Sequence, residues 1–111
     1  MEISHSELKR CDLIKVSGRV DSATAPELKA AIDEVLNNGH YKLVLDMNGV
    51  KFISSAGLGV LIATQKVCKR YNRGELVLAD LQPNILSSIK LAGFVPLFKI
   101  FDDNVSAVGY F

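Results

Sequence analysis

The sequence predicts a single α/β domain, with a mixed, mainly parallel sheet of four or five strands flanked by about four helices. The chain has 111 residues, 49% hydrophobic and 23% charged, which suits one core spanning residues 1–111. Hydrophobic residues alternate in some segments and recur every three or four residues in others. These segments follow the order β-β-α-β-α-β-α-β-α, and helical crossovers make successive strands parallel, leaving the N-terminal strand antiparallel.

The N-terminal segments predict a hairpin. Residues 13–20 alternate apolar and polar side chains, as expected of a strand with one buried face. Residues 2–8 form a weaker partner strand, with the turn between them at residues 9–12.

Residues 24–36 change to a helical period. Thr24 and Glu27 match a T-x-x-E capping box, and Pro26 suits the first turn. The residues Asn37-Asn38-Gly39 tolerate the left-handed conformation and end the helix. The expected buried face consists of Leu28, Ala31, Ile32, Val35 and Leu36.

The central segments predict a short strand, a turn and a second helix. Residues 41–46 are a strand, Asn48-Gly49 is a turn, and residues 50–53 lead to Ser54-Ser55 and the helix. The expected buried face of this helix consists of Val60, Leu61, Thr64, Val67, Cys68 and Tyr71. Its last cations, Lys69, Arg70 and Arg73, complement the negative end of the helix dipole; a partner-binding patch is the alternative.

The C-terminal segments continue the alternation. Residues 75–80 predict a strand, Pro83 begins a third helix that Gly93 ends, and residues 95–101 predict another strand. Asp102-Asp103 caps a short final helix. Ile85, Leu86, Ile89 and Ala92 are expected to face inward from the third helix, and Val105 and Val108 from the last.

Charge and cysteine content narrow the function. The net charge of +1 gives no overall field toward phosphate backbones, so direct nucleic-acid binding is not expected. There is no signal-peptide pattern and no apolar window of membrane-spanning length, which predicts a cytoplasmic protein without membrane insertion. Cys11 and Cys68 are in no CxxC pair and are expected to be reduced and half-buried.

Catalytic and cofactor motifs are incomplete. Ser55 has a glycine two residues after it but Ile53 two residues before, which is half of a G-x-S-x-G elbow. His5 and His40 have no metal-ligand spacing, and His40 is expected to be a solvated imidazole in a turn. Gly57-Leu58-Gly59 would need a third glycine at position 62 to match a dinucleotide fingerprint. We therefore expect no enzyme, no cofactor and no metal site.

The junction at residues 54–59, Ser-Ser-Ala-Gly-Leu-Gly, stands out because it joins a strand to the positive end of a helix. One serine suffices as an N-cap worth about 1 kcal/mol. The small residues Ala56, Gly57 and Gly59 would leave the other hydroxyl accessible and let a partner backbone approach. A helix start also tolerates phosphate, because its free amides and dipole stabilise a dianion.

The segment Asp46–Leu61, which reads DMNGVKFISSAGLGVL, resembles the signature of STAS domains, specifically the bacterial anti-sigma factor antagonists. The resemblance covers nearly the whole chain. It extends to Gly18-Arg19-Val20-Asp21, Thr24-Ala25, Leu78-Ala79 and Leu91-Ala92-Gly93-Phe94.

The resemblance implies a STAS-type domain that works as a binding module. In this family the unphosphorylated antagonist binds an anti-sigma factor that is a serine kinase and frees the sigma factor; the kinase then phosphorylates the antagonist, and a phosphatase reverses the modification. By position Ser55 matches the phosphoacceptor. The family usually has Asp immediately before it, where this chain has Ser54, so Ser54 is an alternative acceptor and a capping role without modification is another.

The expected partner-binding residues surround this junction. Asp21 and Asp46 are expected beside it at strand ends, either in the partner contact or as loop caps, and Thr24 chiefly as a cap. Leu58 is expected at the interface and Val60 in the core. The complete set is Asp21, Thr24, Asp46, Ser54, Ser55, Ala56, Gly57 and Leu58.

Two other functions are open at this point. One is a STAS subunit that docks on a transporter or stress-signalling complex and is never phosphorylated. The other, a small serine hydrolase, lacks a visible base. A weak homodimer is a further expectation, since the aromatic stretch with Phe94, Phe98 and Phe101 is either core or partly a dimer contact.

Overall fold

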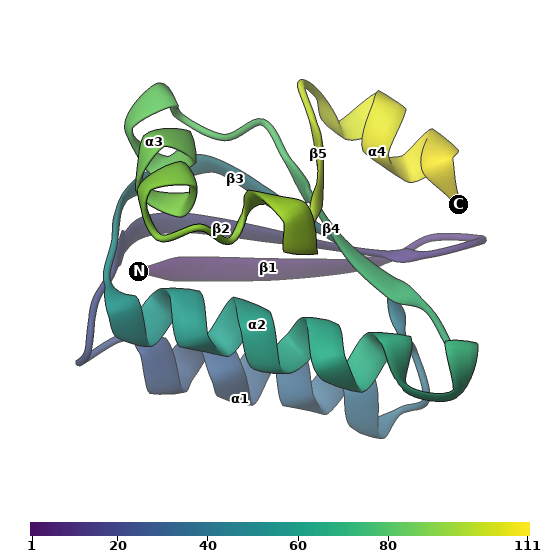
Figure 1. Ribbon diagram of the computed structural model, residues 1–111. Helices are drawn as coiled ribbons and strands as arrows, with labels where there is room; N and C mark the ends of the chain where they lie inside the picture. The colour runs from purple at the N-terminus through teal and green to yellow at the C-terminus, as the bar shows by residue number, and fades with distance from the viewer.

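Five strands form one sheet in the order β1-β2-β3-β4-β5. The computed structural model describes residues 1–111, and Figure 1 shows the sheet with helices on both sides. β1 is antiparallel to β2, and every other neighbouring pair is parallel, which confirms the predicted fold class. The elements are β1 Glu2–Glu7, β2 Asp12–Val20, α1 Ala25–Asn37, β3 Lys42–Ile53, α2 Ser55–Lys69, η1 Arg70–Asn72, β4 Glu75–Ala79, α3 Pro83–Leu91, η2 Val95–Leu97, β5 Lys99–Phe101 and α4 Asn104–Tyr110.

The core has two parts, one on each face of the sheet. The helices α1 and α2 run side by side along one face, where the larger part lies (Figure 1). Side chains at alternate positions of β2 and β3 fill this part because strand residues point to opposite faces in turn. The short helix α4 covers part of the other face through Ala107. No helix combines the length and apolar character needed to cross a membrane.

The predicted turn at Asn48-Gly49 is wrong, because β3 continues through it. Gly49 pairs with Ser17 of β2, and the register shifts on either side of this pair. A Cβ on Gly49 would lie 2.5 Å from the Ser17 Cβ. The glycine therefore permits a close approach of two strands at a bulge, which in sequence looks like a turn.

The end of α2 also differs from the prediction. The helix ends at Lys69, and Tyr71, expected in its buried face, is 85% exposed with φ of 58°. Arg73 returns to the helix, where its guanidinium donates to the Val67 carbonyl at 2.7 Å and lies over the Tyr41 ring. Arg73 thus provides a hydrogen-bond donor for a carbonyl in the last turn of α2, as expected of a cation near a helix C-terminus.

The C-terminal third is less regular than predicted. Residues 95–97 form the 3-10 helix η2, with Pro96 near its start, so only residues 99–101 pair as strand β5. Ala92 is exposed just after α3, and Val105 is exposed while Ala107 is buried. The predicted cap of α4 is confirmed, because the Asp103 carboxylate accepts from the Ser106 amide at 2.7 Å.

Both cysteines are free and fully buried rather than half-buried. Burial raises the pKa of the Cys68 thiol to about 11. It also raises the pKa of Cys11, where the Asp12 charge acts in the same direction. Both thiols therefore stay protonated and act as small apolar side chains.

Candidate functional site

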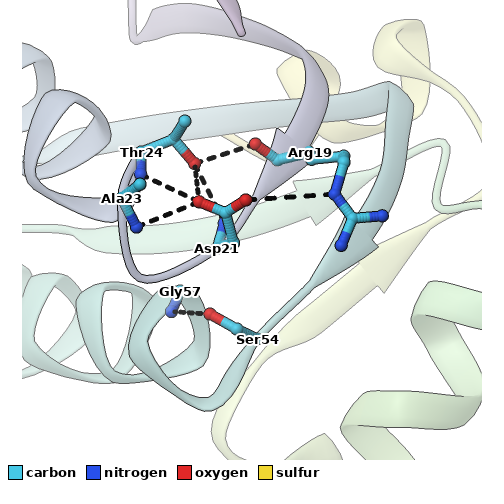
Figure 2. Close-up of polar contacts among 6 residues, drawn as sticks. All are labelled: Arg19, Asp21, Ala23, Thr24, Ser54 and Gly57. Carbon is cyan, nitrogen blue, oxygen red and sulfur yellow. Dashed lines mark hydrogen bonds and ion pairs between the residues drawn. The ribbon is translucent and has the colours of Figure 1, made fainter.

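The serine junction lies beside the loop that follows β2, because β2 and β3 are parallel and end at the same edge of the sheet. The Ser54 amide donates to the Val20 carbonyl at 2.8 Å, which holds the two strand ends together. Figure 2 shows the loop with Asp21 and Thr24 next to Ser54 and the start of α2. This edge is the candidate site.

Ser54 is the N-cap of α2. Its backbone is extended, its hydroxyl oxygen accepts from the Gly57 amide at 3.2 Å, and its carbonyl accepts from Leu58 at 2.9 Å. The hydroxyl thereby satisfies one of the amides that the first turn leaves without a carbonyl partner.

Ser55 is the first residue of α2 and is exposed. Its hydroxyl takes no part in a hydrogen bond with another residue, unlike that of Ser54. The first four amides of a helix have no intrahelical carbonyl to bond. Here Ser54 donates to the Val20 carbonyl and Gly57 to the Ser54 hydroxyl, which leaves the amides of Ser55 and Ala56. An accessible hydroxyl therefore lies at the positive end of a 15-residue helix.

The next residues divide between surface and core. Ala56 is exposed, whereas Leu58 is only 7% exposed and belongs to the larger core, so the expectation of an interface position for Leu58 is wrong. Val60, expected in the core, is half-buried against it. Gly57 is buried, and a Cβ there would lie 2.7 Å from Val20 Cγ1 and 2.8 Å from Ile53 Cγ1. Its small size lets the start of the helix pack closely against β2 and β3. The expected role of Gly57 in the approach of a partner stays a prediction.

The loop after β2 is held by Asp21 and Thr24. One Asp21 carboxylate oxygen accepts from the amides of Ala23 and Thr24, each at 3.0 Å. The Thr24 hydroxyl accepts from the Asp21 amide at 2.9 Å and has two acceptors within donating distance, the Arg19 carbonyl at 2.8 Å and Asp21 Oδ1 at 3.2 Å (Figure 2). Thr24 stands at the N-cap position of α1 but makes no side-chain bond to the helix, so the predicted capping box with Glu27 is wrong.

These hydrogen bonds favour the ionised form of Asp21. They lower its pKa, chiefly through the Thr24 amide, with smaller contributions from Ala23, the Thr24 hydroxyl and the Arg19 charge, against an opposing effect of burial. Asp21 thus carries a negative charge beside the serine junction at neutral pH.

Two residues of this edge were not singled out from the sequence. Arg19 lies 4.3 Å from the centroid of the Phe52 ring, in cation-π geometry, and its Nε is 3.9 Å from an Asp21 oxygen. Phe52 is 38% exposed. Arginine and aromatic side chains are enriched in protein interfaces. The alternation of residues 13–20 already predicts an exposed Arg19, but the register shift between Gly18 and Arg19, which sets Phe52 opposite Arg19, could not be predicted from the sequence.

Asp46 does not lie at this edge, which corrects the expectation that the sheet would bring it beside the junction. It is buried, and its carboxylate accepts from the Asn48 amide at 2.9 Å and from the Asn104 side chain at 2.8 Å. Residues 47–53 of β3, extended at about 3.3 Å per residue, separate it from Ser54. Asp46 therefore ties the middle of β3 to the start of α4.

Neither a metal-binding group nor a histidine lies at this edge. The chain contains no group of three His, Cys, Asp or Glu side chains arranged to hold a metal ion. Both histidines bond to Asp12, at the first residue of β2, whereas the junction adjoins the last. This edge presents a free hydroxyl on Ser55, the unpaired amides of the helix start, the exposed side chains of Arg19 and Phe52, and the half-buried carboxylate of Asp21.

Comparisons with known proteins identify the same family along the chain. The family model described as "STAS domain" matches residues 3–107. The chain is 32% identical over 96 residues to "Putative anti-sigma factor antagonist BtrV" of Bordetella bronchiseptica, a match that covers 86% of this chain and 82% of that protein. It is 25% identical over 97 residues to "Anti-sigma F factor antagonist" of Paenibacillus polymyxa, with the same coverage, 86% and 82%.

A solved structure agrees with these sequence matches. The crystal structure of an anti-sigma factor antagonist from Mycobacterium paratuberculosis superposes with a TM-score of 0.88 at 27% identity, covering 98% of this chain and 92% of that one. The family model spans nearly all of the sequence, and relatives that match most of the chain are named anti-sigma factor antagonists. The chain therefore belongs to the STAS domain family.

Proposed function

We propose that this protein is a cytoplasmic anti-sigma factor antagonist. Its unphosphorylated form binds an anti-sigma factor that is a serine kinase, and a sigma factor is released. Phosphorylation of Ser55 by that kinase ends the binding, and a phosphatase restores it. The partner surface is the edge formed by the Asp21 loop, the rim of Arg19 and Phe52, and residues 54–56.

The observation that carries this proposal is the difference between the two adjacent serines. The Ser54 hydroxyl is engaged with the Gly57 amide, while the Ser55 hydroxyl is exposed and unbonded. A kinase needs a hydroxyl that it can reach, so Ser55 is the better acceptor. This supports Ser55 over Ser54 although the acidic residue usual in the family is absent.

A phosphate at Ser55 would change binding more than folding. Phosphoserine carries about −1.5 to −2 charges at pH 7, and the start of α2 offers free amides and the positive end of its dipole. The same charge pressed into a partner surface must be desolvated or repelled. A penalty of about 3 kcal/mol lowers affinity by more than 100-fold.

The positions of the histidines support a binding protein over a hydrolase. A serine nucleophile needs a base within hydrogen-bond reach. Both histidines instead contact Asp12, whose place at the start of β2 is the far end of the strand from the junction.

The test is phosphorylation of the purified protein by candidate anti-sigma kinases with ATP, followed by intact mass and site mapping. We expect one added phosphate, at Ser55. Ser55→Ala should abolish it, whereas the matched variant Ser54→Ala, which loses only the cap, should still be phosphorylated. A phosphate at Ser54 would contradict the assignment, and stable binding without modification would favour a docking subunit.

A further inference from the structure

Both histidines of the chain converge on one buried carboxylate. The Nε2 atom of His5 lies 2.5 Å from Asp12 Oδ2, and the Nδ1 atom of His40 lies 3.0 Å from the same oxygen. Asp12 is only 4% exposed. The three residues come from β1, from β2 and from the turn between α1 and β3, so the cluster joins three separate parts of the chain.

The geometry favours a charged His40. A carboxylate oxygen can only accept, so the two nitrogens that face ionised Asp12 both carry a hydrogen. The other nitrogen of His40, Nε2, lies 3.6 Å from a Glu7 oxygen. Neutral His40 would turn a lone pair toward Glu7, whereas the imidazolium presents N–H groups to both acids. The pKa of His40 is accordingly raised, first by the hydrogen bond to Asp12 and then by its charge, with burial opposing and Glu7 adding to the rise.

Other charged groups line the space beside the cluster. A cavity of about 220 Å³ beside it is lined by the β1–β2 turn, the α1–β3 turn, the start of β3 and Arg73. Its cationic lining residues, Lys9, Arg10, Lys42 and Arg73, oppose a further positive charge, but none of them forms an ion pair with Glu7 or Asp12. Cys11 also lines the cavity and stays neutral because its pKa is raised. The acids therefore dominate at His40.

We propose that this cluster is a pH-dependent clamp, which fastens the β1–β2 hairpin to the α1–β3 turn when His40 is charged and loosens when it is neutral. A histidine whose pKa is higher in the folded protein than in the unfolded chain stabilises the fold, and the full effect is present at any pH below the unfolded-state pKa. The stabilisation is lost as the pH rises through the folded-state pKa. The clamp is therefore closed below the ordinary histidine pKa of 6.5 and opens as the pH rises through the raised pKa of His40.

The element released lies at one edge of the sheet. β1 is an edge strand paired only with β2, and most of its residues are exposed. Edge strands with little buried surface open at low free energy, so the loss of one charge contact there is measurable. The cluster lies at the opposite end of β2 from the serine junction, and the inference does not depend on the proposed function.

The test follows His40 by NMR between pH 5 and pH 9 in EDTA, together with amide-exchange protection factors of β1. In the wild type we expect His40 to titrate above its ordinary range. Asp12→Asn and Glu7→Gln should each move its midpoint to lower pH, whereas Asp33→Asn, which removes a distant exposed ion pair, should not. Protection of β1 should fall several-fold as His40 deprotonates, and that of β4 should not change.

An unchanged His40 midpoint in both acid variants would overturn the proposal. So would constant protection of β1 across the titration of His40. If Asp12→Asn does not fold, Glu7→Gln and the wild type carry the test, because Glu7 is exposed and its replacement leaves the core intact.

Discussion

Ser54 and Ser55 show how much one position along a helix start changes the role of a side chain. Ser54 lies outside the helix and closes its first turn by accepting from the Gly57 amide. Ser55 is the first residue within the helix, is exposed, and its hydroxyl bonds to no other residue. Stability and modification are thereby assigned to different residues, so each can be altered separately.

The two glycines of the junction provide a stability test at the residue scale. Gly57→Ala should lower the free energy of unfolding by about 1–3 kcal/mol, because the new Cβ would overlap Val20 and Ile53. Gly59→Ala is the matched control. It is exposed, with no atom within 4 Å of the added Cβ, so alanine should raise stability by about 0.5–1 kcal/mol. Denaturant unfolding measures both changes.

An equal effect of the two substitutions would contradict this account of Gly57. It would mean that the glycine is not needed for packing of the helix start against β2 and β3, and that its small size serves another purpose.

Single residues differ in how far their positions follow from the sequence. The cap at Asp103 and the exposed Ser55 follow from local patterns, because both depend on a nearby helix end. The contacts of Asp46 and of the two histidines do not follow from local patterns. The tertiary fold brings Asn104 to Asp46 and Asp12 to the histidines, and the spacing of these residues in the sequence does not indicate either contact.

At the scale of elements, Gln65 of α2 replaces a missing piece of strand. Its side-chain amide donates to the Leu76 carbonyl at 3.0 Å and the Leu97 carbonyl at 2.8 Å, and its oxygen accepts from the Leu76 amide at 2.8 Å. The pairing of β5 with β4 begins at Val77. Gln65 therefore supplies the hydrogen bonds that β4 lacks where residues 95–97 coil into η2.

The role of Gln65 predicts a large loss of stability. Gln65→Leu should lower the free energy of unfolding by at least about 2 kcal/mol, because it leaves buried backbone groups of Leu76 without partners. In the matched control Gln82→Leu, the lost hydrogen bond to Asn48 is exposed, so water replaces it and the cost should be much smaller. Thermal unfolding of the two variants compares these costs; equal melting temperatures would refute the role assigned to Gln65.

The 3-10 helix η2 at residues 95–97 explains why the last strand was predicted too long. The apolar residues of 95–101 fit a strand, but Pro96 has no amide hydrogen and suits the first turn of a 3-10 helix. The pattern of hydrophobic residues predicted the number, order and direction of the elements correctly. It could not predict where strands bulge or stop, because Gly49 and Gln65 act through contacts with distant residues.

For the whole molecule, the sheet separates two polar regions. The carboxyl ends of β2 and β3 carry the serine junction and the Asp21 loop, while the amino end of β2 carries the histidine cluster with Asp12. Figure 1 shows the start of α2 at one end of the sheet and the turn between β1 and β2 at the other. A charge added at Ser55 should thus leave the rest of the fold, including the histidine cluster, unchanged.

The most direct test of the central claim is the affinity of the Ser55→Asp variant for the anti-sigma partner, measured with its melting temperature beside those of the wild type and Ser55→Ala. The exposed position at the helix start predicts melting within a few degrees of the wild type and a loss of affinity of more than about 100-fold for Ser55→Asp. Ser55→Ala should keep both properties. Full binding by Ser55→Asp, or its global unfolding, would contradict the proposed switch.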